Sequence, residues 1–204
     1  VGQRRSLSLA DGSQIQLNTD TAIDVSFDAT QRLIRLRSGE ILIQTGKLGD
    51  QRPFLVETRD GRIQALGTRF SVHKLSGSTR VGVLEDRVSV QPADQSTSAM
   101  ILKAGEGADF DSRHIGVLYP FKSSAVAWTN GQLIVLDARL GEVIEELGRY
   151  RSGVMHCDSR ARDLRVSGTF RLDSTDAVLA NLQASLPINV RYFTRYWVSI
   201  SHSV

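Results

Sequence analysis

The chain has 204 residues, of which 41% are hydrophobic and 23% are charged. These proportions are typical of a folded soluble protein and exclude a disordered or fibrous one. The net charge of +3 is spread evenly, with 16 basic and 14 acidic residues up to Ser124 and 9 and 8 after it. Because no segment concentrates basic residues, we expect no nucleic-acid partner.

The cysteine count and the hydropathy pattern limit the class of protein further. Cys157 is the only cysteine, so it has no partner for an internal disulfide, and we expect it to be a small buried apolar residue. The sequence has no run of about 18 apolar residues and no signal-peptide pattern. Because it starts at Val1 without an initiator methionine, we expect a soluble part excised from a longer protein.

The first part of the chain has the pattern of β-strands. From Leu7 to Phe110, apolar residues recur at every second position, as at Ile15 and Leu17, and polar residues fill the positions between them. This period places one side-chain set on one face of each strand. Turn sequences such as Asp60-Gly61 separate about ten short strands. A sandwich, a jelly roll and a short solenoid all fit this all-β pattern.

A connector follows the strands. The segment from Asp111 to Ala127 contains Pro120 and the pair Ser123-Ser124, and it has little periodicity. Such a segment is typical of the crossing between two cores. We therefore expect an all-β domain over residues 1–124 and a second domain over residues 125–204.

The second domain alternates strands with amphipathic helices. A strand over Leu133–Leu136 precedes Asp137, a candidate N-cap, and a helix that we expect from about Ala138. Its apolar stripe consists of residues at positions i, i+3, i+4 and i+7, namely Leu140, Val143, Ile144 and Leu147.

The same order then repeats. We expect strands at Val154–His156 and Leu164–Leu172, and a second helix that Asp173 or Ser174 caps and Pro187 ends. The segment from Ile188 to Tyr192 alternates, and Tyr196–Ile200 forms a closing strand. The result is a small α+β domain of two strand-helix-strand units and a terminal strand.

Motifs of common catalytic sites are absent from the sequence. It contains no G-x-S-x-G and no H-E-x-x-H, and its four histidines stand singly. We therefore expect no catalytic residues, no cofactor and no metal. One enzymatic alternative stays open, namely two carboxylates that converge in a cleft, because no spacing singles out such a pair.

Short signatures along both domains resemble the FecR family. They are Leu9-Ala10-Asp11-Gly12-Ser13, Gly39-Glu40, Pro53-Phe54-Leu55-Val56-Glu57-Thr58, Ala65-Leu66-Gly67-Thr68-Arg69-Phe70-Ser71-Val72, Trp128-Thr129-Asn130-Gly131-Gln132-Leu133, Arg139-Leu140-Gly141-Glu142-Val143-Ile144-Glu145-Glu146-Leu147 and Val166-Ser167-Gly168-Thr169-Phe170. The chain departs from the family at Leu42, where an aromatic residue is common, and at Asp86, where glycine is common. We expect Asp86 to take the left-handed conformation that this turn requires.

The resemblance implies the periplasmic region of a single-pass inner-membrane regulator of iron uptake in a Gram-negative bacterium. The implied partners are the N-terminal signalling domain of a TonB-dependent outer-membrane siderophore receptor, a periplasmic protease and an extracytoplasmic-function (ECF) sigma factor, which a cytoplasmic region outside this sequence would bind. The segment after Trp128 is similar to the secretin and TonB short N-terminal domain. Such a regulator relays ferric-siderophore occupancy to the sigma factor without catalysis.

We place the receptor interface on the closing strand, which offers an unpaired edge for backbone hydrogen bonds. The candidate partner-binding residues are Tyr192, Tyr196, Trp197 and Val198. The aromatic residues supply large contact area, although they can equally fill the core under the helices. The strand at Val154–His156 is the alternative edge.

A carbohydrate-binding or envelope scaffold module is the rival function from another class, because β-rich domains with aromatic grooves bind sugars. Aromatic residues make up only 6% of this chain, and they form no stripe in the strand region. The sequence does not rank the roles of the all-β domain, which include a spacer, a second contact surface and a guard against proteolysis.

Overall fold

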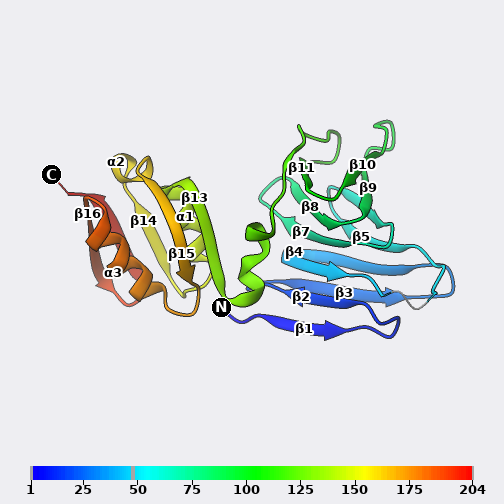
Figure 1. Cartoon of the computed structure of the whole chain (residues 1–204), viewed down its shortest axis with the longest axis horizontal. Helices are drawn as coiled ribbons and strands as arrows, with labels where there is room; N and C mark the ends of the chain where they lie inside the picture. Colours follow the sequence, from blue (N-terminus) through cyan, green and yellow to red (C-terminus); the bar gives the residue numbers. More distant parts are fainter. Residues whose placement is uncertain (1, 47–48, 204) are drawn as a thin grey trace. The chain divides into compact units, whose positions relative to one another are not determined.

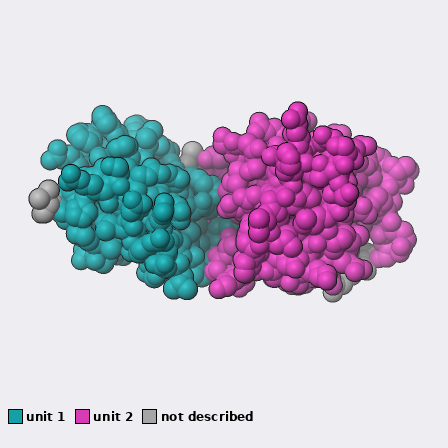
Figure 2. Space-filling model, turned by 90° about the horizontal axis from the view of Figure 1, so that it is seen from above, with its two compact units in different colours: residues 1–3, 127–204 teal, residues 4–126 magenta. Residues whose placement is uncertain are grey.

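A computed structural model describes residues 2–46 and 49–203 of the chain. The chain divides into two compact units, coloured separately in Figure 2. Residues 4–126 form the first, which we call the β unit, and residues 1–3 and 127–204 form the second, the mixed unit. The predicted boundary after Ser124 lies inside η1 (Ser123–Asn130), a 3₁₀ helix in which the chain passes between the units.

The β unit consists mostly of strands, which agrees with the prediction of an all-β domain in this part of the chain. No helix in residues 2–46 or 49–203 has the length and apolarity needed to cross a bilayer. The strands are β1 (Arg5–Ser8), β2 (Gln14–Leu17), β3 (Ala22–Phe27), β4 (Arg32–Gln44), β5 (Phe54–Thr58), β6 (Gly61–Ala65), β7 (Arg69–Lys74), β8 (Thr79–Glu85), β9 (Arg87–Pro92), β10 (Met100–Lys103), β11 (Glu106–Phe110) and β12 (Tyr119–Pro120).

One long strand, β4, joins the two halves of a curled sheet (Figure 1). The first half of β4 pairs with β3 and β5, and its second half pairs with β2 and β7. Strands β6, β9 and β10 extend one side, and β8, β11 and β12 extend the other. Among the described strands of this unit, only β4 and β5 pair in parallel, which the sequence pattern did not predict.

The change of partners along β4 takes place at Gly39. This residue has a φ of +83°, and a Cβ atom placed on it would lie 2.3 Å from Thr21 Oγ1. Glycine therefore allows both the positive φ and the close approach of the neighbouring segment. The turn residue Asp86 has a φ of +57°, which confirms the prediction that aspartate occupies a left-handed position here.

A single apolar core lies between the two halves of the β unit. Ile34 and Ile43, from the two halves of β4, are both buried in it, together with Phe54, Phe70 and Phe110. Because alternate residues of each strand point inward, the period of two in the sequence predicts this core closely.

The mixed unit has the predicted order of strands and helices, with one additional short helix, α2. Two sheets form, one of β13 and β15 and one in the order β14, β17, β16. Helices α1 and α3 each contact both sheets. The elements are β13 (Gln132–Arg139), α1 (Leu140–Gly148), β14 (Val154–Cys157), α2 (Ser159–Arg162), β15 (Arg165–Arg171), α3 (Thr175–Ser185), β16 (Ile188–Thr194) and β17 (Trp197–His202).

The start predicted for the first helix of this unit is wrong. Strand β13 continues to Arg139, and α1 begins at Leu140 with Arg139 as its N-cap. Asp137 does not cap the helix, because it lies in a bulge of β13 with a φ of +51°. The bulge lets β13 resume its pairing with β15 at Ala138, opposite Val166.

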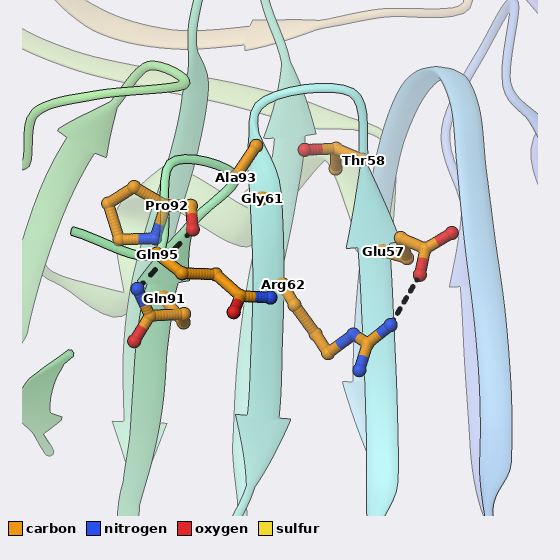
Figure 3. A pocket seen from close by; sticks show the side chains of 8 residues that line it. All are labelled: Glu57, Thr58, Gly61, Arg62, Gln91, Pro92, Ala93 and Gln95. Carbon is orange, nitrogen blue, oxygen red and sulfur yellow. Dashed lines mark hydrogen bonds and ion pairs between the residues drawn. The ribbon is translucent and has the colours of Figure 1, made fainter. Parts of the chain in front are cut away.

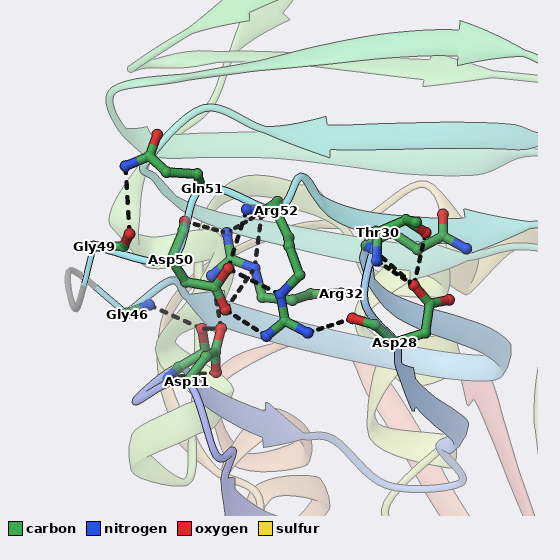
Figure 4. Close-up of polar contacts among 11 residues, drawn as sticks. Asp11, Asp28, Thr30, Arg32, Gly46, Gly49, Asp50, Gln51 and Arg52 are labelled. Carbon is green, nitrogen blue, oxygen red and sulfur yellow. Dashed lines mark hydrogen bonds and ion pairs between the residues drawn. The ribbon is translucent and has the colours of Figure 1, made fainter.

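A buried ion-pair cluster fixes one end of the β unit (Figure 4). Arg32 and Asp11 are each only 7% exposed, and Arg32 Nη1 lies 2.8 Å from Asp11 Oδ2. The same guanidinium donates to the carbonyl oxygen of Arg52 through Nε and Nη2. Arg52 in turn pairs with Asp50 at 2.6 Å. The cluster thus ties three segments that are distant in sequence.

The carboxylate of Asp11 is stabilised in its charged form despite burial. Burial alone would raise its pKa, but hydrogen bonds from Ser13 and the charge and hydrogen bond of Arg32 outweigh it and hold the pKa below its usual value. Arg32 therefore offsets the desolvation of this buried charge.

Replacing Arg32 with methionine tests this role, because the variant keeps apolar volume and removes the charge. We expect Arg32→Met to lower the free energy of unfolding by about 3–5 kcal/mol, since Asp11 stays buried without its cation. Arg37→Met is the control, because Arg37 and Asp24 form a pair whose side chains are 64% and 52% exposed. It should cost less than about 1 kcal/mol. Equal losses in urea unfolding would contradict the account.

Candidate docking surface

Strand β17 is the central strand of the three-stranded sheet in the mixed unit. It pairs in parallel with β14 and antiparallel with β16. Successive side chains point to opposite faces, so Val198 and Ile200 lie in the core against the helices while Trp197 points outward. Val198 is 0% exposed and Trp197 is 52% exposed. The strand thus separates a core face from an outer face.

The prediction that the closing strand has an unpaired edge is therefore wrong. The chain returns from β16 and inserts β17 between β14 and β16, so these two strands form the edges of the sheet. The alternative edge at Val154–His156 lies on β14 and is an outer strand of the sheet. Because the Val198 side chain is buried, it is not accessible to a partner.

A stacked pair of aromatic rings lies on the outer face. The centroids of Phe193 and Trp197 are 4.7 Å apart with the rings inclined by 31°, and Phe193 is 51% exposed. Tyr192 faces Val198 and Thr194 faces Trp197, so Phe193 is the extra residue of a β-bulge. Its ring lies against that of Trp197 on the outer face.

Phe193 is the residue that sequence reasoning missed. Alternation places it on the face opposite to Tyr192, where the structure has it, but its contact with Trp197 depends on the pairing of two strands. The available signal was the run of aromatic residues on both sides of the Thr194-Arg195 turn.

Arginine side chains accompany these rings. The guanidinium carbon of Arg191 lies 5.9 Å from the centroid of the Phe193 ring, and that of Arg195 lies 4.5 Å from the centroid of Tyr196. Both distances are in the range of cation–π contacts. We call Val154, Phe193 and Trp197 on the outer face, together with the exposed Tyr196 in the adjoining turn, the aromatic surface. Each of its four residues has a large exposed hydrophobic side chain.

Tyr192 is half exposed but lies on the helix side of the sheet, opposite Val198. Its hydroxyl lies 3.2 Å from Asp176 Oδ1, and Arg151 pairs with the same carboxylate. Burial, followed by the charge of Asp176, raises the pKa of Tyr192. Of the four residues predicted to bind a partner, the structure thus brings Trp197 and Tyr196 to the aromatic surface and places Tyr192 and Val198 elsewhere.

Close packing of two loops positions the turn that carries Tyr196. The Val154 amide donates to the Tyr196 carbonyl oxygen at 2.7 Å, and Arg151 Nη2 donates to the Arg195 carbonyl oxygen at 2.8 Å. Gly153 lies beside this turn with a φ of +106°, and a Cβ atom on it would lie 2.1 Å from the Tyr196 carbonyl oxygen. Only glycine allows this approach.

Other features of the described residues supply weaker candidates for a site. A hollow in the β unit is lined by Glu57, Arg62 and Gln91 among others (Figure 3). Its charged groups pair with each other, with Arg62 Nη2 at 2.9 Å from Glu57 Oε2. Within residues 2–46 and 49–203, no group of three or more His, Cys, Asp or Glu residues is placed to hold a metal ion.

The single cysteine has no features of a reactive thiol. Cys157 is buried, as predicted. Burial, and then the charge of Asp158, raises the pKa of its thiol to about 11. Because the thiolate is the reactive form, this thiol is inert at neutral pH.

Comparisons with known proteins agree with this architecture. Residues 1–89 match the family model described as "FecR protein". Two crystal structures of a "putative anti-sigma factor" from Parabacteroides distasonis ATCC 8503, at 1.65 and 2.50 Å resolution, resemble the chain with TM-scores of 0.81 and 0.79. Each is 24% identical, and each alignment covers 100% of this chain and 96% of the other. A comparison with curated proteins finds no significant match. The structural likeness establishes the fold.

The substitution Gly153→Ala tests how the turn at Tyr196 is positioned. We expect it to lower the free energy of unfolding by about 1–3 kcal/mol, because the new methyl group meets a backbone oxygen and the positive φ is strained. Gly105→Ala is the control for φ alone, because Gly105 has a φ of +85° and nothing within 4 Å of its Cβ position. Both variants are compared by thermal unfolding. If Gly153→Ala lowers the stability no more than Gly105→Ala does, the close approach of Gly153 to the Tyr196 carbonyl oxygen is unimportant.

Proposed function

We infer that this chain, whose residues 1–89 belong to the FecR family, is the periplasmic region of a single-pass inner-membrane anti-sigma regulator in a Gram-negative bacterium. Its task is to bind the N-terminal signalling domain of a TonB-dependent outer-membrane siderophore receptor. The regulator then relays ferric-siderophore occupancy to an ECF sigma factor, which a cytoplasmic region outside this sequence binds. A periplasmic protease acts in the same relay.

The observation that carries this proposal is the aromatic surface. Phe193 and Trp197 are each about half exposed and stack on each other. Their exposed apolar area is in unfavourable contact with water, and a partner that covers it gains free energy. Aromatic and arginine side chains are also the residues that most often dominate protein interfaces. This surface therefore supports docking of a protein.

A signalling relay of this kind requires no covalent chemistry from the chain. Docking of the receptor domain shifts the equilibrium between the free and the bound regulator. The free energy for this shift comes from the contact with the receptor. The aromatic surface is built on two paired strands, β16 and β17, and not on a flexible loop. Rigid placement lowers the entropic cost of binding, because fewer conformations are lost when the partner docks.

Titration of the 204-residue chain with candidate receptor signalling domains tests the proposal. We expect one domain to bind and its relatives to bind much more weakly. Trp197→Ala should weaken that binding by roughly tenfold to a hundredfold, because a central aromatic contact is lost. The thermal transition should stay nearly unchanged, since half of the indole is already exposed.

Leu136→Ala is the matched control. Leu136 is 83% exposed on β13, in the other sheet of the mixed unit, and its loss should leave the affinity unchanged. Equal affinity of Trp197→Ala and the wild type would remove the aromatic surface as the docking site. If no receptor domain binds and a glycan array shows specific sugars retained, the carbohydrate-binding function replaces the proposed one.

A further inference from the structure

Beside the stacked rings, the outer face carries a square of hydrogen-bond donors. Asn189 faces Ser201 and Arg191 faces Ser199 across β16 and β17. These four side chains lie on the outer face with Phe193, and the same residues line a surface hollow. Directly opposed residues have Cβ atoms about 4.5–5.5 Å apart, so their polar groups converge.

The donors of this square have no hydrogen-bond partner in the part of the chain that the structure describes. Within residues 2–46 and 49–203, the side chains of Asn189, Ser199 and Ser201 form no hydrogen bond, and Arg191 has no carboxylate partner. Its recorded contact is with the ring of Phe193. Several other arginines of the mixed unit do pair with carboxylates, as Arg151 does with Asp176 and Arg171 with Asp173.

The segment that contains β16 and β17 has basic residues but no acidic ones. Residues 177–204 contain Arg191 and Arg195 and no aspartate or glutamate. All eight carboxylates of residues 127–204 precede this segment. Because Arg191 has no carboxylate partner among the described residues, the outer face of β16 and β17 carries an unpaired positive charge beside the stacked rings.

We propose that this hollow receives an aspartate or glutamate side chain of the receptor signalling domain, next to an apolar residue that covers Phe193 and Trp197. The inference rests on the proposed function and specifies the partner as an acidic surface around an apolar contact. A guanidinium binds a carboxylate through two parallel hydrogen bonds. Hydroxyl and amide donors at Ser199, Ser201 and Asn189 complete the set for a carboxylate, which accepts about four hydrogen bonds.

Charge reversal at Arg191 tests the inference with the receptor domain that binds most tightly in titration. Arg191→Glu should weaken binding by roughly tenfold or more, and the affinity should lose part of its dependence on salt. Arg191→Lys keeps the charge but loses the paired geometry, so it should cost only a few-fold. Arg160→Glu is the control, because Arg160 lies on α2 and has no carboxylate partner among the described residues.

Rescue by the partner identifies the carboxylate directly. Each aspartate and glutamate of the bound receptor domain is replaced by lysine and tested against Arg191→Glu, and one replacement should restore most of the lost affinity. If the domain binds but Arg191→Glu leaves affinity and salt dependence unchanged, the carboxylate site is wrong while the proposed function stands. If no receptor domain binds, both fall together. Equal losses for Arg191→Glu and Arg160→Glu would indicate a general charge effect and overturn the site.

Discussion

The pairing of β17 with a strand on each side is the constraint on which the mixed unit depends. It fixes which residues of this strand enter the core and which face outward. Val198 and Ile200 close the core against the helices, while Trp197, Ser199 and Ser201 remain on the outer face. A shift of one residue would exchange these two sets and bury the indole in place of the aliphatic side chains.

In the proposed docking, two kinds of group on the outer face have different roles. The stacked rings of Phe193 and Trp197 offer apolar area, which contributes affinity. The donors around Arg191 offer direction and charge, which contribute selectivity and the rate of encounter. Because these groups occupy adjacent positions of β16 and β17, they form one continuous surface.

The β unit carries most of the FecR match and has its own core and ion-pair cluster, so its stability does not require that surface.

Much of the fold follows from the sequence because alternation is a local property. The period of two predicts the strands of the β unit and buried residues such as Ile34 and Phe70, and the apolar stripe predicts α1. Spatial order is not local. Two features depend on contacts between distant segments, namely the parallel pair of β4 and β5 and the insertion of β17 between β14 and β16. The sequence of a single strand does not indicate which strands it pairs with.

Irregular strand positions account for the remaining errors. Asp137 has the composition of a helix cap, yet the pairing of β13 with β15 continues past it through a bulge. Phe193 lies in a second bulge, after which Thr194 shares the outer face with Trp197. Of the residues predicted to bind a partner, Trp197 and Tyr196 are exposed in the structure, and their role in binding stays a prediction. The donor square was missed because it needs the register of two strands.

Backbone amide shift mapping tests the central claim most directly. In this measurement, the ¹H–¹⁵N spectrum of the labelled 204-residue chain is followed during titration with the receptor domain that binds. The account predicts the largest changes at the Trp197 indole and along β16 and β17, with smaller ones at Val154. Changes concentrated in the β unit or on β13 and β15, with an unmoved Trp197 signal, would contradict it.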